Sequence, residues 1–364
     1  MLTVQQLRAH ATGQSLFQPT TLKAALERLS FVQADPIRSP ARAQDLILRH
    51  RVKAYRAGQL ENRYPGLDIE EDILYAYGFL PRRVWQLLQP RKTTGLGALE
   101  RRVLEAVKQF GETHPRELQT HLGRRRVLND WGGYSAATTR TLERLRHRGL
   151  LRIARRDRGI RIYELARPHD LSLTSDERLR KLILIIAGIL APVPEKSLRS
   201  TVTRYRHWGN PRAALDALLR TGELERQSVD GMAYVWPAVT DRQAFTDLPR
   251  QVLLLAPFDP LVWDRRRFEH LWGWAYRFEA YTPTAKRIRG YYAMPMLWGD
   301  AVIGWANVVV HGDRLSIEPG FVSKPPRESR FRSELERETE SLRAFLNLGS
   351  TVSTSILWNP ANAC

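Results

Sequence analysis

Two segments of this chain carry the same pattern at an offset of 73 residues. Residues 142–165 read LERLRHRGLLRIARRDRGIRIYEL, and residues 215–238 read LDALLRTGELERQSVDGMAYVWPA. Each copy predicts a leucine-striped helix, a glycine stop, a strand, a turn containing Asp and Gly, and a second strand. The offset pairs five positions, namely Leu142, Leu145, Gly149, Leu151 and Asp157 with Leu215, Leu218, Gly222, Leu224 and Asp230. A chain with this repeat should contain two similar small modules.

Short helices are expected just before each copy, at 115–123 (PRELQTHLG) and 197–207 (SLRSTVTRYRH). Helices followed by a two-stranded hairpin are typical of a winged helix-turn-helix. A weaker third copy occurs at 21–35, where TLKAALERLSFVQAD also runs from a helix into a strand. We therefore expect three winged-helix modules, at residues 1–95, 96–170 and 171–245.

The pattern changes from Gln251 onward. Segments of alternating apolar residues are separated by Asp, Gly and Pro, which predicts a small antiparallel β-barrel with a basic hairpin over residues 246–325. Its expected strands are 251–258, 275–283, 290–298, 301–310 and 314–322. A helix is expected at 326–349 and a loose tail at 350–364. The fold class predicted is α+β.

Charge points to a polyanionic partner. The chain has 57 Lys and Arg against 38 Asp and Glu, a formal charge of +19. Double-stranded DNA is the commonest target of such a surface. The longest apolar run, 182–191, is about half the length of a membrane-spanning helix and predicts a buried helix instead. The N-terminus lacks the features of a secretory leader, so we expect a cytoplasmic, nucleoid-associated protein with no membrane partner.

Metal and nucleotide cofactors are not expected. The nine His residues are scattered, and Cys364, the lone Cys, can form no internal disulfide. No glycine-rich phosphate loop occurs, which argues against a nucleotide cofactor.

Three groups of basic residues are candidate DNA contacts. Arg140, Arg144 and Arg148 should face outward from the helix at 136–149, and the wing at 155–159 (RRDRG) adds charge. In the expected barrel hairpin, aromatic residues accompany a second group, Lys286, Arg287 and Arg289. Arg38 and Arg42 form the third group, and Arg49 and Arg51 follow as further phosphate candidates.

One acidic residue lies at the start of this third basic region. Strand alternation places Gln33 and Asp35 on one face, so that an amide and a carboxylate share a small site. The alternative is structural, with Asp35 capping a turn before Pro36. The acidic trio Glu70, Glu71 and Asp72 should face solvent or pair with Arg.

The chain resembles the YcaQ/AlkZ-type DNA glycosylases of interstrand crosslink repair. Gln33-Ala34-Asp35 is similar to the Gln-x-Asp form of their motif, and residues 256–300 resemble their C-terminal signature almost throughout. Weaker resemblance extends to about residue 325. The resemblance implies tandem winged helices, a β-barrel, and hydrolysis of the N-glycosidic bond of alkylated N7-type purines in duplex DNA, including crosslinked ones.

In that chemistry Asp35 would stabilise the positive charge that develops on the sugar, and Gln33 would orient the attacking water. An N7-alkylated purine is already cationic, so no strong general acid is needed. With no Lys singled out for a Schiff base, we expect a monofunctional, monomeric, cofactor-free enzyme that leaves an abasic site.

The chain departs from the family pattern at three places. Gln44 and Asp45 stand where family members have two His, Tyr75 stands where they have His, and Gly304-Trp305-Ala306-Asn307 replaces Gly-Arg-x-Asp. These departures leave three interpretations open: the protein acts on a different lesion, its pocket is narrower, or the activity has been lost. The alternative function is a non-catalytic winged-helix DNA-binding protein or transcriptional regulator, in which Gln33 and Asp35 are structural.

Overall fold

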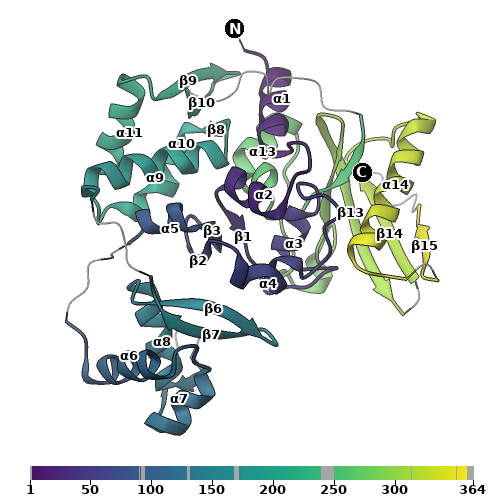
Figure 1. Cartoon of the computed structure of the whole chain (residues 1–364). Coiled ribbons are helices and arrows are strands. Elements are labelled where there is room, and N and C mark those ends of the chain that lie inside the picture. The colour runs from purple at the N-terminus through teal and green to yellow at the C-terminus, as the bar shows by residue number, and fades with distance from the viewer. Residues whose placement is uncertain are drawn as a thin grey trace. The chain divides into compact units, whose positions relative to one another are not determined.

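The computed structural model describes residues 2–89, 91, 95–128, 132–167, 172–238, 250–312, 314–349 and 351–358. The chain forms two compact units, shown in Figure 1. Residues 1–59 and 179–364 make up the first, called here the main unit, and residues 60–178 make up the second, the inserted unit. The main unit is thus built from two stretches that are separated in sequence by the other unit.

The inserted unit consists of short helices and three hairpins. Its helices are α4 (Gln59–Arg63), α5 (Arg82–Leu87), α6 (Ala98–Phe110), α7 (Pro115–Leu122) and α8 (Ala137–His147), with a 3₁₀ turn at Tyr64–Gly66. Its antiparallel hairpins are β2 (Ile69–Ile73) with β3 (Tyr77–Pro81), β4 (Arg126–Leu128) with β5 (Tyr134–Ala136), and β6 (Leu151–Asp157) with β7 (Ile160–Leu165). Helices α6, α7 and α8 pack on one another, and α8 packs on β6.

The main unit contains the second copy of the repeat. Helix α9 (Ser175–Ile189) leads into β8 (Val193–Pro194), α10 (Glu195–Val202), a 3₁₀ turn (Thr203–Tyr205), α11 (Pro211–Arg220), β9 (Leu224–Val229) and β10 (Met232–Pro237). Strands β8, β10 and β9 form an antiparallel sheet in that order. Asn210 caps α11, because its side chain accepts the N–H groups of Arg212 and Ala213.

Both copies of the repeat have the predicted order of helix, glycine and hairpin. Gly149 follows α8 at φ 74°, and Gly222 follows α11 at φ 75°, in the left-handed region where glycine ends helices without strain. The Leu pairs Leu142 and Leu145, and Leu215 and Leu218, are fully buried. The repeat therefore reflects two equivalent helix-hairpin cores.

The prediction that Asp157 and Asp230 occupy equivalent turn positions is wrong. Asp230 lies in the two-residue turn between β9 and β10, but Asp157 is the last residue of β6, and Arg158 and Gly159 form the turn. Strand β6 has seven residues and β9 has six, and the register of the first hairpin shifts between Ile153 and Arg155. A bulge thus absorbs one extra residue, which a constant offset cannot reveal.

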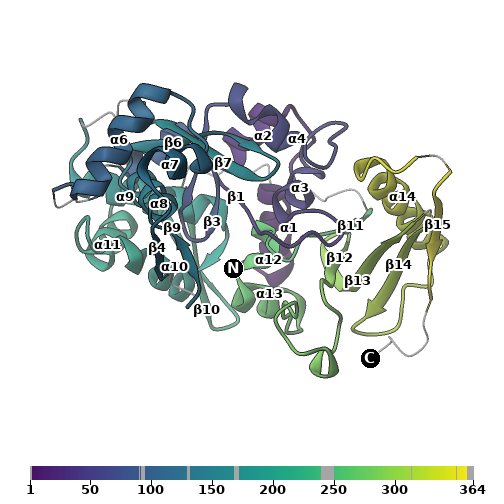
Figure 2. The ribbon, with the colours of Figure 1, turned by 90° about the horizontal axis from the view of Figure 1, so that it is seen from below.

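The C-terminal sheet of the main unit differs from a closed antiparallel barrel. Its order is β11 (Val252–Leu254), β12 (Met294–Trp298), β13 (Ala301–His311), β14 (Arg314–Phe321) and β15 (Ser353–Ile356). No pairing between the edge strands β11 and β15 closes it among the described residues. Helix α14 (Ser329–Phe345), predicted from the sequence, packs against both edge strands (Figure 2).

Two local predictions for this region are wrong. Residues 275–283 form no strand; the whole segment 275–293 is a loop with one 3₁₀ turn at Thr284–Lys286, so the basic residues lie in a loop and not in a hairpin. Part of the expected loose tail is ordered, since β15 pairs in parallel with β14. Residues 350 and 359–364 of that tail, including Cys364, lie outside the described residues.

The main core joins the two stretches of the main unit. Helix α1 (Val4–Ser15) packs on α12 (Pro260–Trp263) and α13 (Arg265–Trp272), and Leu7 and Ala11 are buried with Phe268, Leu271 and Trp305. The run 182–191 is largely buried, as predicted, in and just after α9. Among the described residues, no helix has the length and apolar character needed to cross a membrane.

Candidate active site

The short strand β1 (Val32–Gln33) carries the first residue of the Gln-x-Asp motif. It follows α2 (Leu22–Leu29), whose last turn ends at Ser30 in the left-handed conformation, and Val32 is buried. The strand ends at Gln33, so Asp35 lies two residues beyond it, and strand alternation does not fix its direction. Both Gln33 and Asp35 are half-buried, within reach of solvent.

The Asp35 carboxylate caps a turn, as the structural alternative predicted. Its Oδ1 accepts the backbone N–H of Ile37 at 2.9 Å, across Pro36. No other hydrogen bond or ion pair of Asp35 occurs in the part of the chain that the structure describes. Burial raises the pKa of the Asp35 carboxyl, and the Ile37 hydrogen bond partly offsets that effect. One carboxylate oxygen is therefore uncommitted in a partly desolvated setting.

The Gln33 side chain, two residues before Asp35 in the chain, carries an unsatisfied acceptor. Its Oε1 is buried and has no hydrogen-bond partner among the described residues. A buried polar atom without a partner costs about 1–3 kcal/mol, so it needs a reason to persist. An acceptor held for a water molecule is one such reason.

Aromatic side chains from the 275–293 loop lie near Asp35. The charge of Asp35 contributes, after burial, to raising the pKa of both the Tyr281 and Tyr292 phenols. Tyr292 packs edge-on against Phe278 at 5.3 Å between ring centroids, and Phe278 packs against Tyr281 at 6.1 Å. The Tyr292 hydroxyl is buried and has no hydrogen-bond partner among the described residues. The rings of Phe278, Tyr281 and Tyr292, called here the aromatic wall, thus lie together, and two of them are within electrostatic range of the carboxylate.

This loop is held by one buried carboxylate. Glu279 Oε2 accepts the backbone N–H groups of Ile288 and Arg289 at 2.9 Å and that of Gly290 at 3.2 Å. Asn307, at one of the departures from the family pattern, donates to the Arg289 carbonyl at 2.8 Å. A Cβ on Gly290 would lie 2.2 Å from Asn307 Oδ1, so only glycine fits there.

The three predicted basic residues of the loop have different environments. Lys286 is exposed, and the Arg287 guanidinium lies 5.1 Å from the centre of the Tyr291 ring. The Arg289 guanidinium lies beside both Trp274 and Trp305, 5.2 and 5.5 Å from their ring centres. Arg289 therefore stabilises the loop from within, while Lys286 and Arg287 remain candidates for contact with DNA.

The basic residues that follow the motif also divide into two classes. Arg38 is exposed, and Arg42 precedes α3 (Ala43–Leu48) as a half-buried residue. Arg49 is paired with Glu338, and Arg51 is paired with Asp259 at 2.8 Å, all four side chains being buried. The suggestion that Arg49 and Arg51 hold phosphates is wrong, because both are enclosed with their counter-ions.

Two buried residues stand where the family has histidines. Asp45 Oδ1 accepts the Tyr55 hydroxyl at 2.7 Å and the Gly58 N–H at 3.1 Å, which closes the segment between α3 and the end of the first stretch. Gln44 is also buried, and its Oε1 has no hydrogen-bond partner among the described residues. Helix α3 contacts β1, so this second unsatisfied amide lies on an element that supports the motif.

In the inserted unit, the predicted recognition helix offers less free charge than its sequence suggests. Arg144 is exposed and forms no ion pair among the described residues. Arg140 donates to the Leu128 carbonyl, and Arg148 pairs with Glu100 at 2.7 Å. Only Arg144 of the three is thus both exposed and uncommitted.

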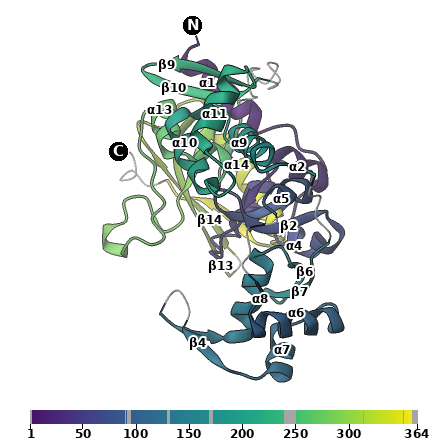
Figure 3. The ribbon, with the colours of Figure 1, turned by 90° about the vertical axis from the view of Figure 1, so that its left-hand side faces the viewer.

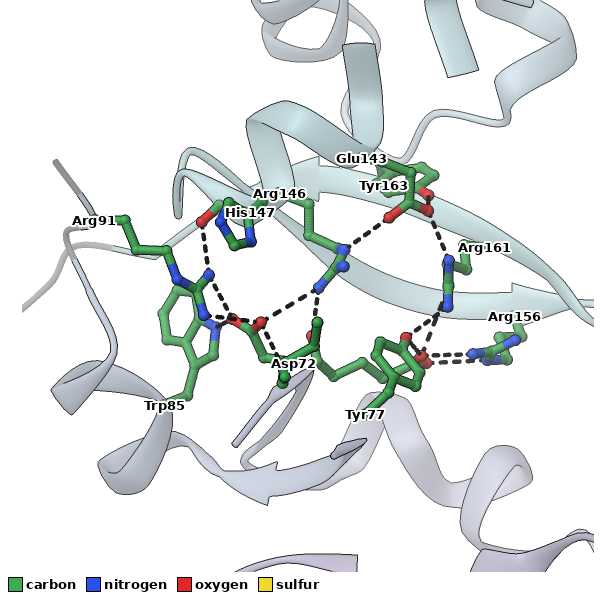
Figure 4. A network of polar contacts seen from close by, with 12 residues as sticks. Asp72, Tyr77, Trp85, Arg91, Glu143, Arg146, His147, Arg156, Arg161 and Tyr163 are labelled. Atoms are coloured by element: carbon green, nitrogen blue, oxygen red, sulfur yellow. Dashed lines mark hydrogen bonds and ion pairs between the residues drawn. The ribbon is translucent and has the colours of Figure 1, made fainter. Parts of the chain in front are cut away.

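The acidic trio lies in a buried polar network that the sequence did not reveal in detail, and Figure 4 shows the part of it around Asp72 and Tyr77. Glu70, Glu71 and Asp72 are each at most 3% exposed. Their partners come from β3, α5, α8, the β6–β7 hairpin and residue 91, and they are Arg82 and Arg152 for Glu70, Arg156, Arg161 and Tyr77 for Glu71, and Arg91, Arg146 and Trp85 for Asp72. Burial raises the pKa of Glu70 to about 7, against the effect of Arg152.

This network changes the role expected for the wing. Arg156 and Arg161 bind Glu71, and Arg155 pairs with Glu112 at 2.7 Å. The expectation that the acidic trio pairs with arginine is confirmed, and its consequence is that several wing arginines hold the inserted unit together.

The described residues contain no group of three or more His, Cys, Asp or Glu that could hold a metal ion. The candidate site therefore consists of one carboxylate, one amide and an aromatic wall. Such a set can stabilise a developing cation and hold a water molecule.

Comparison with known proteins places the chain in a family and supports its fold. Residues 26–345 match the family described as DNA glycosylase AlkZ-like. The structure is similar to that of the DNA glycosylase AlkZ of Streptomyces sahachiroi, with a TM-score of 0.61 at 15% sequence identity, over 98% of this chain and 100% of that one. The chain belongs to the AlkZ-like DNA glycosylase family.

Proposed function

We propose that this protein is a monofunctional DNA glycosylase of DNA repair that acts on alkylated N7-type purines in duplex DNA, including crosslinked ones. The observation that carries the proposal is the half-buried Asp35 carboxylate, with one uncommitted oxygen, two residues from the unsatisfied Gln33 amide oxygen. Family membership supports the reaction class. Winged-helix modules and a monomeric state belong to the same proposal.

The reaction breaks the bond between the sugar C1′ and the purine nitrogen. The bonding electrons go to the base, which neutralises the positive charge that the alkyl group conferred, and the sugar becomes an oxocarbenium-like cation. The Asp35 carboxylate stabilises that charge electrostatically. A water held by Gln33 attacks C1′, and its proton passes to Asp35 or to solvent, leaving an abasic site.

The aromatic wall suits a cationic base. Tyr281 is 77% exposed beside the carboxylate, so its ring face is available to an extruded purine or to a neighbouring base. A positive base gains from both the ring quadrupole and the carboxylate, whereas a neutral base gains little from either. This difference supports alkylated over unmodified purines as substrates.

The test is excision by Asp35→Asn on duplexes that contain N7-methylguanine or a nitrogen-mustard crosslink, in EDTA, with alkaline cleavage of the abasic sites. Asn can still accept the Ile37 N–H, so the substitution removes charge while keeping the turn. We expect a loss of at least 100-fold in the single-turnover rate, in line with removal of an electrostatic stabiliser. DNA affinity should change by less than about threefold.

Asp68→Asn is the matched control, since Asp68 is a surface residue in an exposed ion pair with Arg167. It should excise at the wild-type rate. Wild-type protein that binds one palindromic sequence tightly and excises neither lesion would support the alternative, a DNA-binding regulator.

A further inference from the structure

A hairpin between α7 and α8 interrupts the helix-turn-helix order of the inserted unit. Its strands pair Arg126 with Ala136, Val127 with Ser135 and Leu128 with Tyr134. Figure 3 shows β4 running clear of the helical bundle formed by α6, α7 and α8. Residues 129–131, between the strands, lie outside the described residues. Nothing in the sequence pattern of the repeat predicts this element, and the second copy has no counterpart among the described residues.

The hairpin exposes arginines together with large apolar side chains. Arg124, Arg125 and Arg126 are all exposed, and none forms an ion pair in the part of the chain that is described. Leu128 is 57% exposed and Tyr134 is 65% exposed. The Arg126 guanidinium lies 5.5 Å from the centre of the Tyr134 ring. Three consecutive exposed cations are therefore gathered at the start of the hairpin, one of them against an exposed aromatic ring.

The base of the hairpin is fixed to the start of α8. The Ala137 N–H donates to the Arg125 carbonyl at 2.8 Å, and Arg140 from the first turns of α8 donates to the Leu128 carbonyl. Ala136 ends β5 and also precedes the first residue of α8. The hairpin is thus an ordered extension of this helix, and less conformational entropy is lost when it binds a partner.

The charge balance of the inserted unit points in the same direction. On α8 and the β6–β7 hairpin, Arg146, Arg152, Arg156 and Arg161 are paired with buried or half-buried carboxylates. A polyanion could recruit those residues only by breaking pairs that hold the unit together, which is costly. Arg124, Arg125 and Arg126 can bind a polyanion at no such cost.

We propose that the β4–β5 hairpin is a principal DNA-contacting element of the inserted unit, in which Arg124, Arg125 and Arg126 bind backbone phosphates and Tyr134 and Leu128 enter a groove. The proposal rests on the proposed function, which supplies duplex DNA as the partner. Arginine beside an aromatic or apolar wedge is a combination that suits DNA, because one part neutralises phosphate and the other packs on sugar or base edges.

The test compares two triple variants in duplex DNA binding as a function of salt. The first changes Arg124, Arg125 and Arg126 to Gln. The second, a matched control, changes Arg102, Lys108 and Arg116 to Gln, three exposed cations on α6 and α7 of the same unit. Because each phosphate contact contributes about 0.9 to the slope of log K against log salt, the first variant should lower the slope by roughly 2.7. Its affinity at 150 mM salt should fall by roughly 100-fold.

The control should lower the slope by less than one and the affinity by only a few-fold, since it removes the same charge from another face. Thermal unfolding should be unchanged in both, because all six side chains are exposed.

Tyr134→Ala, which keeps the charge, should weaken binding by about five- to 100-fold with the slope unaltered. Equal losses in the two triple variants would overturn the proposal. Equal losses of the first variant on duplex DNA and on polyglutamate would overturn the assignment to DNA.

Measuring excision as well as DNA binding distinguishes a failure of this proposal from a failure of the proposed function. The Arg124→Gln, Arg125→Gln, Arg126→Gln variant alters neither Gln33 nor Asp35 but binds DNA more weakly, so it should need a higher enzyme concentration than wild type to reach its half-maximal rate of N7-methylguanine excision. If the wild type excises nothing, the proposed chemistry fails while the binding comparison still decides the role of the hairpin.

Discussion

At the scale of single residues, Asp35 caps a turn and is also the candidate catalytic carboxylate. These two roles are usually treated as alternatives. One oxygen of its carboxylate closes the turn across Pro36, and the other is uncommitted among the described residues. The turn fixes the direction of the side chain without consuming its charge. A capping Asp is therefore compatible with a catalytic one, and the turn supplies the preorganisation that an electrostatic stabiliser needs.

The raised pKa of Asp35 gives the proposed enzyme a defined pH dependence. Only the ionised carboxylate stabilises the sugar cation, and burial makes ionisation harder. Single-turnover excision should therefore decline on acidification at a pH above the ordinary Asp value of 3.8. The Asp35→Asn variant should show no such decline over the pH range in which the protein remains folded. An identical acidic decline in wild type and variant would contradict this assignment.

The sequence located the motif but could not distinguish free arginines from paired ones. Gln33 and Asp35 were singled out by an apolar strand followed by Pro, and their functional role was predicted from the resemblance of Gln33-Ala34-Asp35 to a family motif, both signals contained within a few residues. Arg148 and Arg289 were predicted as DNA contacts by the same logic as Arg144, yet one pairs with Glu100 and the other packs beside two Trp rings. Because the partners come from distant parts of the chain, the local sequence cannot show which arginines are paired and which are free.

At the scale of elements, the 275–293 loop shows why a strand-like pattern can fail. Residues 275–283 alternate aromatic and polar side chains, which is typical of a strand. In the structure the Tyr276 hydroxyl donates to the Ala293 carbonyl, and Glu279 accepts three backbone N–H groups. Side chains thus take the hydrogen bonds that a neighbouring strand would otherwise provide, and the alternation serves aromatic packing.

Removing the Glu279 carboxylate should loosen this loop. In Glu279→Ala, the N–H groups of Ile288, Arg289 and Gly290 lose their acceptor, at a cost of about 1–3 kcal/mol each where they stay buried. We expect cleavage by trypsin after Lys286 or Arg287 to become at least tenfold faster, measured by mass spectrometry. Glu269→Ala, which removes an exposed carboxylate from α13, should leave the cleavage rate at the wild-type value. An equal rate in the two variants would show that the loop is held by other contacts.

At the scale of the whole molecule, buried ion pairs join the two stretches of the main unit. Arg51 and Asp259 form a two-pronged pair, with contacts of 2.8 and 2.9 Å, and neither side chain reaches solvent. Arg51 also donates to the carbonyls of Ser15 and Ile47. All three guanidinium nitrogens thus donate hydrogen bonds inside the protein, which explains why a basic residue tolerates complete burial.

Breaking this pair on one side should be costly. Arg51→Met leaves the Asp259 carboxylate buried without its counter-ion, so the free energy of unfolding should fall by about 3–5 kcal/mol. Changing both residues, Arg51→Met with Asp259→Leu, should recover part of that loss. Arg180→Met, which breaks the exposed pair with Glu223, should cost less than about 1 kcal/mol. Urea denaturation followed by circular dichroism measures all three, and a double variant less stable than Arg51→Met would contradict the explanation.

Because the main unit is divided into two stretches, its parts are synthesised at different times. Its first 59 residues leave the ribosome before the 119 residues of the inserted unit, and Asp259 and Glu338 emerge later still. At ~5–20 residues per second, the nascent N-terminal stretch waits on the order of 6–24 s while the inserted unit is made. During that interval Arg49 and Arg51 lack Glu338 and Asp259, their partners in the folded main unit, because those two carboxylates have not yet been synthesised.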